Sequence, residues 1–198
     1  MSLLDHDQLA LWYRPAGEGF FDRLTSDEPL PIGDETGASV GSVSLDAGLF
    51  DRPDYWMREA DGTPAIGVRH ADGVLAGITH PYHSVVWGDG SDVGVFHDGY
   101  VHWQGRAVAR WRVDSGWRRE VAHFDGGWLW DPSEQLVATI GDVQPADGAY
   151  LQLTRSGDPD ECLRWCSLAF LLVAREHRAR AESAAAQARM RSHRRRFD

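Results

Sequence analysis

The sequence predicts a mainly β fold, a closed antiparallel β-barrel of about twelve strands around a buried apolar helix near the C-terminus. Two observations support this prediction. Residues 168–174 are all apolar, so a helix that contains them is apolar on every side and must be enclosed. Most of the preceding chain consists of short strand-like runs separated by turn signals. Short strands can enclose one helix only by closing around it.

The first 54 residues contain the weakest strand signals. Residues 9–13 and 20–24 are aromatic-rich runs that predict a first pair of strands. The next stretch contains Pro29, Pro31 and Gly33, which predict a break in the chain. We expect a third strand at residues 38–45 and a loop at residues 46–54.

From Tyr55 onward, regularly spaced turn signals predict an antiparallel meander. Asp-Gly dipeptides begin at residues 61, 72, 89, 98, 125 and 147, and Asp114-Ser115-Gly116 is a similar signal. Asp-Gly favours tight turns because Gly adopts positive φ angles without a steric penalty and Asp bonds to its own backbone. The intervening runs predict nine strands, at residues 65–69, 74–79, 84–87, 93–97, 100–104, 106–113, 117–123, 136–140 and 149–154.

The predicted core helix has a recognisable start. Asp158 suits the N-cap, Pro159 the first helical position and Glu161 the third residue of a capping box. The apolar part spans about 13 residues, fewer than the ~20 needed to cross a bilayer, so we expect it to be surrounded by protein. We therefore predict one domain over residues 1–180, followed by a basic, flexible tail at residues 181–198.

The charge distribution limits the classes of partner. The net charge is −10, and all twenty basic residues are arginines. Residues 151–198 hold ten arginines against six acids, so the preceding body carries the acidic excess. An acidic body opposes non-specific binding to nucleic acid, so we expect no nucleic-acid partner. The apolar segment is too short to cross a bilayer, so we also expect no transmembrane segment. Residues 1–7 lack a cationic flank and a long apolar run, so we expect no signal peptide and a cytoplasmic location.

Three segments carry a resemblance to a known family. Residues 131–140 form an Asp-turn-strand unit that a similar unit at residues 34–43 repeats, residues 150–153 form a last strand, and residues 158–161 open the apolar helix. In this order they resemble the tubby C-terminal-like superfamily, which includes phospholipid scramblases and the LURP-one-related proteins. The resemblance implies a barrel of about twelve strands, no catalytic centre, and lipid or protein binding at membranes.

An arginine cluster is the best candidate for a binding site. Its members are Arg106, Arg110, Arg112, Arg118 and Arg119, and only Asp114 interrupts the positive charge of this segment. Alternation along residues 106–113 predicts that the first three arginines share one face, and a turn at residues 114–116 would bring the others beside them. Guanidinium groups suit phosphate oxygens, so we expect an anion or lipid-headgroup site, with Trp103 and Trp117 contacting a membrane or partner. The alternative is a solvated face paired with surface acids.

The remaining residues suggest weaker alternatives. The histidines of the predicted hairpins are candidates for a small hydrolase or isomerase: His80, His83, His97, His102 and His123. A lipocalin-like carrier of an apolar ligand would instead require an empty barrel with the helix outside. No nucleophile or cofactor motif is present, so we expect a non-enzymatic binding or scaffold module without metal or cofactor. Cys162 and Cys166 are expected to be buried free thiols.

Overall fold

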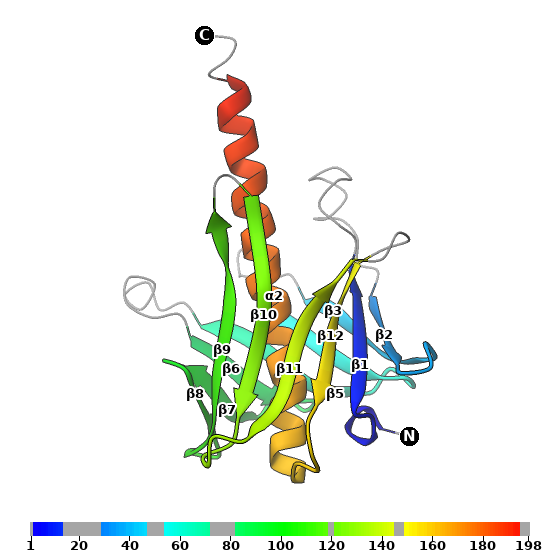
Figure 1. Ribbon diagram of the computed structural model, residues 1–198. Coiled ribbons are helices and arrows are strands. Elements are labelled where there is room, and N and C mark those ends of the chain that lie inside the picture. Colours follow the sequence, from blue (N-terminus) through cyan, green and yellow to red (C-terminus); the bar gives the residue numbers. More distant parts are fainter. Residues whose placement is uncertain are drawn as a thin grey trace.

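A computed structural model describes residues 2–13, 29–46, 54–71, 82–118, 121–144 and 149–194. The described strands form a closed antiparallel barrel in which sequence neighbours pair and β1 closes against β12 (Figure 1). A short 3-10 helix, η1 (Leu3–Asp5), precedes the barrel, and a long helix, α2 (Glu161–Arg194), passes through it. The strands are β1 (Gln8–Tyr13), β2 (Leu30–Asp34), β3 (Ser39–Asp46), β4 (Asp54–Glu59), β5 (Pro64–Ala71), β6 (Tyr82–Trp87), β7 (Asp92–His97), β8 (Tyr100–Trp103), β9 (Arg106–Arg118), β10 (Val121–Trp130), β11 (Leu136–Val143) and β12 (Ala149–Arg155).

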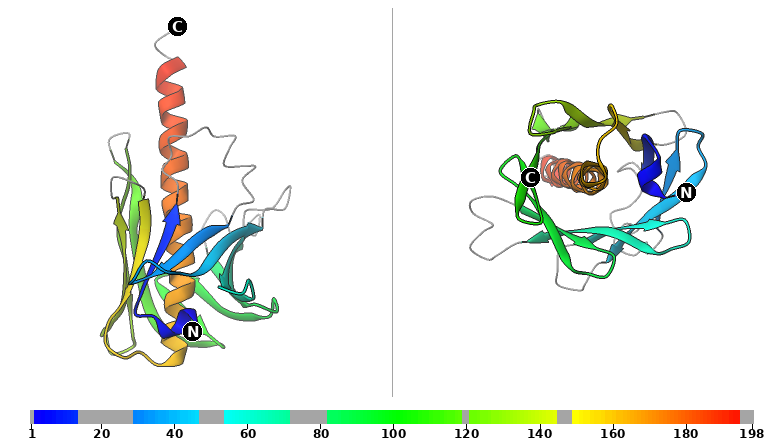
Figure 2. Two further views of the ribbon diagram at one scale, coloured as in Figure 1. Left: turned by 90° about the vertical axis from the view of Figure 1, so that its right-hand side faces the viewer. Right: turned by 90° about the horizontal axis from the view of Figure 1, so that it is seen from below.

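Helix α2 is the centre of the hydrophobic core. Viewed along its axis, the helix lies inside the ring of strands (Figure 2). Every residue from Cys166 to Ala174 is fully buried. Phe170 stacks on Phe96 of β7 with ring centroids 6.2 Å apart, and the alternating residues Leu151 and Leu153 of β12 also face the core. The predicted helix-filled barrel is therefore confirmed.

The helix begins two residues later than its sequence signals indicate. Its first residue is Glu161, and the carboxylate of Asp160 accepts a hydrogen bond from the Leu163 amide at 2.9 Å. This is the geometry of an N-cap aspartate, so Asp160 caps the helix. The predicted cap, Asp158, instead pairs with Arg164 at 3.1 Å.

Two strands were absent from the sequence prediction. Strand β2 contains Pro31 and Gly33, which we had interpreted as a break, and its central residue Ile32 is fully buried. Strand β4 begins at the end of the predicted loop and directs Tyr55 and Met57 into the core. The predicted strands at residues 20–24 and 74–79 lie outside the described residues.

Two expected turns are instead parts of long strands. Asp114-Ser115-Gly116 lies within β9, and Asp125-Gly126 lies within β10. The register between these strands shifts between Phe124 and Gly126, and Gly126 has φ 142°. This is a β-bulge, a feature that accommodates an extra residue without ending the strand. The predicted strand at residues 117–123 is consequently divided between the end of β9 and the start of β10.

The repeated Asp-turn-strand unit corresponds to a shared hairpin turn. Asp34 Oδ1 accepts hydrogen bonds from the amides of Thr36 and Ala38, and Asp131 Oδ1 accepts them from the amides of Ser133 and Gln135. The same backbone pattern also closes the β4–β5 and β6–β7 turns, where Gly62 and Gly90 occupy the positive-φ position. In the Asp131 turn that position is occupied by Glu134, with φ 64°.

Helix α2 continues well beyond the barrel (Figure 1). Its backbone is helical to Arg194, while the last described side chain, Ala181, is buried. The domain boundary at residue 180 and the flexibility of residues 181–198 stay predictions. In the described part of the chain, no helix combines the length and apolar character needed to cross a membrane.

Candidate functional site

Two of the predicted arginines lie on the outer wall of the barrel. Arg110 and Arg112 are exposed residues of β9, separated by the inward-packed Trp111. The register places Arg110 between Tyr100 of β8 and Trp130 of β10. Arg112 lies directly opposite Trp128 of β10. Directly opposed residues on adjacent strands are close enough for their side chains to interact.

Aromatic and aliphatic side chains surround these arginines. Tyr100 is 47% exposed and Leu136, which pairs with Trp130, is 39% exposed; these are the exposed large hydrophobic residues of the described chain. Trp128 and Trp130 are half-buried. We define the arginine–aromatic face as six residues of strands β8 to β11: Tyr100, Arg110, Arg112, Trp128, Trp130 and Leu136.

Four members of this face were not predicted from the sequence. The available signal was the alternation Trp128-Leu129-Trp130, in which two large aromatic residues flank a fully buried leucine. The turn expected at residues 125–126 ends the predicted strand before Trp128, so the sequence analysis does not include the part of β10 that carries this alternation. The pairing of Trp128 and Trp130 with the arginines of β9 could therefore not be predicted.

The electrostatics of the two arginines differ. Arg110 pairs with Glu134 at 3.0 Å, and the two side chains are 55% and 76% exposed. An ion pair this exposed contributes little to stability because water and salt screen it. Arg112 has no ion pair with any described residue. The guanidinium of Arg112 is therefore available to an external anion, and that of Arg110 becomes available when Glu134 is displaced.

Among the other predicted arginines, Arg106 does not join this face. A bulge lies opposite Val101 and His102, so Val108 is an extra residue and alternation along β9 is interrupted. Arg106 consequently pairs with the inward-facing Trp103 and not with the outer face. The side chains of Arg118 and Trp117, and all of Arg119, lie outside the described residues.

Trp103 is a correction to the sequence analysis. We expected it to contact a membrane or partner, but it is 6% exposed and belongs to the core. Its ring packs edge-on against Trp87, which in turn packs against Trp165 of α2. The β8–β9 hairpin turns Trp103 inward, where its large apolar surface is removed from water.

The described histidines proposed for an enzyme occupy different environments. His83 is buried inside the barrel beside α2, whereas His97 is a partly exposed neighbour of Asp98 on β7. His123 lies on β10 near Asp114 and Asp125. His80 lies outside the described residues. The interior that a lipocalin-like carrier would need for its ligand is occupied by α2.

A buried charged network holds the polar part of α2, and the sequence analysis did not predict it. Glu176 lies against His83 of β6, with Oε2 2.9 Å from Nδ1, and also pairs with Arg180. Arg178 reaches Asp142 of β11 at 3.1 Å, and His177 lies 3.3 Å from the hydroxyl of Ser115 on β9. These contacts tie the helix to strands β6, β9 and β11 where its apolar segment ends.

Comparison with known proteins finds a similar chain among the solved structures. No protein-family model and no curated protein matches the sequence. Among solved structures, the chain is similar to the X-ray structure of a protein from Arabidopsis thaliana, AT5G01750, with 15% identity and a TM-score of 0.48. The similarity covers 84% of this chain and 86% of that chain. Membership of the tubby-like superfamily stays a prediction.

Proposed function

We propose that the protein is a non-catalytic binding module that attaches through the arginine–aromatic face to anionic headgroups at a membrane surface. The observation that supports this is the placement of Arg110 and Arg112 among exposed and half-buried aromatic side chains on one outer wall. Guanidinium groups bind phosphate oxygens in a bidentate manner. Trp and Tyr rings favour the boundary between water and hydrocarbon, because one part of the ring is apolar and the other polar.

The acidic body makes this attachment local. With a net charge of −10, the whole molecule is repelled by an anionic surface at long range. Attraction by two arginines acts only within a Debye length of ~8–10 Å at physiological salt. We therefore expect binding that is weak, short-ranged and sensitive to salt, with the aromatic side chains adding a contribution that salt does not screen.

The non-catalytic part of the proposal is supported by the packing of the interior. Helix α2 fills the barrel, and a filled barrel has no room for a deep substrate pocket. Of the described histidines considered for catalysis, His83 lies in the interior, whereas His97 and His123 lie on strands β7 and β10 of the wall.

Liposome sedimentation tests the proposal with variants that change the charge of one residue at a time. Wild type should bind vesicles that contain phosphoinositide or phosphatidylserine better than neutral vesicles, and more strongly at low than at physiological salt. Arg112→Glu should abolish most of this binding. Arg106→Glu is the matched control, because it makes the same charge change on the same strand away from the face. Glu134→Gln should increase binding, because it releases Arg110 from its ion pair.

Three results would contradict the membrane proposal: no binding by wild type, equal binding by Arg112→Glu, or equal losses for Arg112→Glu and Arg106→Glu. Arg, Trp and Tyr are also typical of protein interfaces. If vesicles do not bind, a protein partner becomes the better interpretation of the same face, and the scaffold role should be tested by pull-down with Trp130→Ala as the negative control.

A further inference from the structure

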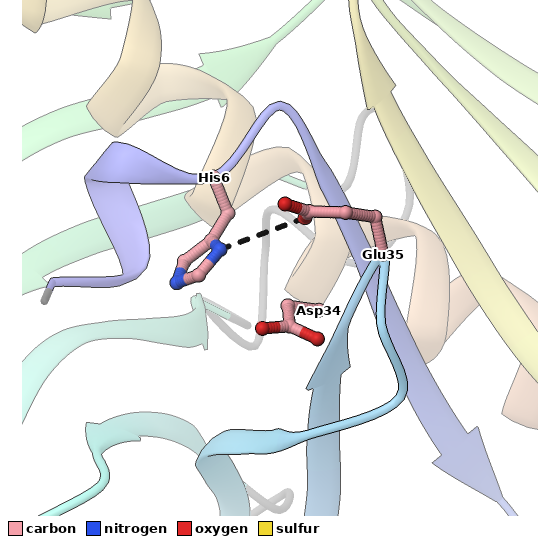
Figure 3. A group of neighbouring side chains, drawn as sticks. All are labelled: His6, Asp34 and Glu35. Atoms are coloured by element: carbon pink, nitrogen blue, oxygen red, sulfur yellow. Dashed lines mark ion pairs between the residues drawn. The ribbon is translucent and has the colours of Figure 1, made fainter.

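Three potential metal ligands meet beside the seam between β1 and β2 (Figure 3). His6 lies between η1 and β1, whereas Asp34 ends β2 and Glu35 begins the following turn. The pairing of Leu9 with Asp34 brings these two segments together. One ligand atom from each of the three side chains lies within 4.8 Å of the other two.

His6 is a buried side chain whose ring nitrogens are unsatisfied. The residue is 2% exposed, and neither nitrogen has a hydrogen-bond partner. The nearest carboxylate oxygen, Oε2 of Glu35, lies 3.6 Å from Nδ1, which is too far for a hydrogen bond. Leaving a buried polar group without a partner costs free energy, so this imidazole is expected to have a ligand. Figure 3 shows the ring directed toward the Glu35 carboxylate, with Asp34 beside it.

Asp34 is already oriented by the hairpin turn that it begins. Its Oδ1 accepts hydrogen bonds from the Thr36 hydroxyl at 2.7 Å, the Thr36 amide at 2.8 Å and the Ala38 amide at 3.0 Å. None of these bonds uses Oδ2, so one oxygen of a fixed carboxylate is available to a cation.

We propose that His6, Asp34 and Glu35 bind a divalent transition-metal ion of the zinc class. One imidazole and two carboxylates form a donor set that suits Zn²⁺ and Co²⁺, whereas Mg²⁺ and Ca²⁺ prefer oxygen ligands throughout. Zinc–ligand bonds are roughly 2.0–2.2 Å long, so the three groups would move toward the ion. Glu35 can make this movement because its side chain is 50% exposed. Water would complete the coordination, since the protein supplies three ligands.

The position of the site allows the ion to strengthen the pairing of β1 with β2. Among the described strands, β1 and β2 have the shortest ladder, which joins only Leu9–Leu11 to Ile32–Asp34. An ion shared by His6 and the β2–β3 turn would fasten this ladder at one end. Because the ligands converge only in the folded chain, binding would stabilise the folded state.

A second cluster of candidate ligands provides the matched comparison. Asp114, His123 and Asp125 also bring three ligand atoms within 4.8 Å of one another. The His123 side chain is 18% exposed, however, and Asp125 is 53% exposed. Asp114 and Asp125 have further interactions in the protein. The ring nitrogens of His123 also lack a hydrogen-bond partner, so the two clusters differ in burial: His6 is enclosed by the protein, whereas His123 is partly open to water.

Calorimetric titration of the metal-stripped full chain with Zn²⁺ tests the proposal, and Co²⁺ absorption reports the ligands. We expect one ion per chain, an increase in melting temperature with Zn²⁺ and none with Mg²⁺ at the same concentration. Glu35→Gln, an exposed substitution, should weaken binding at least tenfold, and His6→Gln should remove it and change the Co²⁺ spectrum. His123→Gln should bind as wild type does.

The opposite pattern would overturn the proposal. Unchanged affinity in Glu35→Gln, or loss of binding in His123→Gln alone, would place the ion elsewhere or show that it is adventitious. Failure of wild type to bind Zn²⁺ would leave His6 as a buried histidine without a ligand. If His6→Gln does not fold, Glu35→Gln and Asp34→Asn, whose changes lie at the turn, still decide the result.

Discussion

At the residue scale, burial of the helix side chains determines which substitutions the fold tolerates. Leu168, Leu171 and Leu172 are fully buried among strands on all sides. Cys162, by contrast, is half-buried one turn before the fully buried Cys166. The same helix therefore contains positions that never meet water and positions that do, within a few residues of one another.

Replacing Leu171 with Asp should abolish cooperative folding. Burying an unpaired carboxylate costs several kcal/mol, which is comparable with the whole stability of a domain. The same result is expected for Leu168→Asp and Leu172→Asp, and circular dichroism with urea titration measures it. Leu136→Asp is the control, because Leu136 is 39% exposed and the variant should fold. A cooperative unfolding transition in Leu171→Asp would contradict an enclosed helix.

The two cysteines should react with iodoacetamide at very different rates. A hydrogen bond from Cys166 lowers the pKa of Cys162, whereas the same hydrogen bond and burial raise the pKa of Cys166. The thiolate is the nucleophile, so the native protein should be labelled at Cys162 at least ~10-fold faster than at Cys166. Peptide mass spectrometry gives the rates, and Cys166 should react fully in denaturant. Equal rates in the native state would show that the helix opens readily.

At the element scale, close approach between α2 and the wall depends on a glycine of β10. A Cβ atom on Gly127 would lie 2.9 Å from Cζ and 3.3 Å from Cε1 of Phe170, whereas one on Gly141 of β11 would meet no atom within 4 Å. The two glycines, on neighbouring strands, thus differ in the room available for a Cβ atom. The backbone of β10 packs directly against Phe170 of α2 at Gly127, whereas open space surrounds the corresponding position at Gly141.

Gly127→Ala should destabilise the protein by about 1–3 kcal/mol, the usual cost of overpacking a core. Gly141→Ala is the matched control and should change stability by less than ~0.5 kcal/mol, as surface substitutions usually do. Urea unfolding of both variants measures the difference. Equal midpoints would mean that Phe170 moves aside without cost, and that α2 is less tightly held by β10 than its packing indicates.

At the scale of the whole molecule, α2 joins the barrel in two ways. Its first half is held by apolar packing, and its next turns are held by the charged network of Glu176, Arg178 and His177 with strands of the wall. Ala181 is the last buried residue of the described side chains. The helix should therefore divide into a part that the barrel requires and a part that it does not.

Deletion of residues 182–198 should leave the melting temperature within a few degrees of wild type, because it retains every helix side chain that is described as buried, up to Ala181. Deletion of residues 176–198 should lower stability severely, because it removes the pairings of Glu176 with His83 and of Arg178 with Asp142. Breaking a buried ion pair by removing one partner typically costs about 3–5 kcal/mol. Calorimetry compares the two truncations. A large loss in the shorter deletion would mean that the tail packs against the barrel or a second copy.

The sequence by itself determined the fold class, because the signals for it are local. An uninterrupted apolar segment predicts a buried helix, and Asp and Gly at short intervals predict hairpins through their own backbone preferences. The units beginning at Asp34 and Asp131 were recognised as similar, and both proved to be the same turn. Arg110 and Arg112 were also placed together correctly, since residues two apart in a strand share a face.

Only the tertiary structure decided which distant residues meet. The register of β8 to β11 assembled Tyr100, Trp130 and Leu136 around the arginines, and a bulge separated Arg106 from them. The pairing of β1 with β2 brought His6 to Asp34, and helix insertion brought Glu176 to His83. Pairings of this kind depend on register, bulges and the order of closure, where a shift of one residue reverses the face of every side chain. Local preferences of the chain do not contain that information.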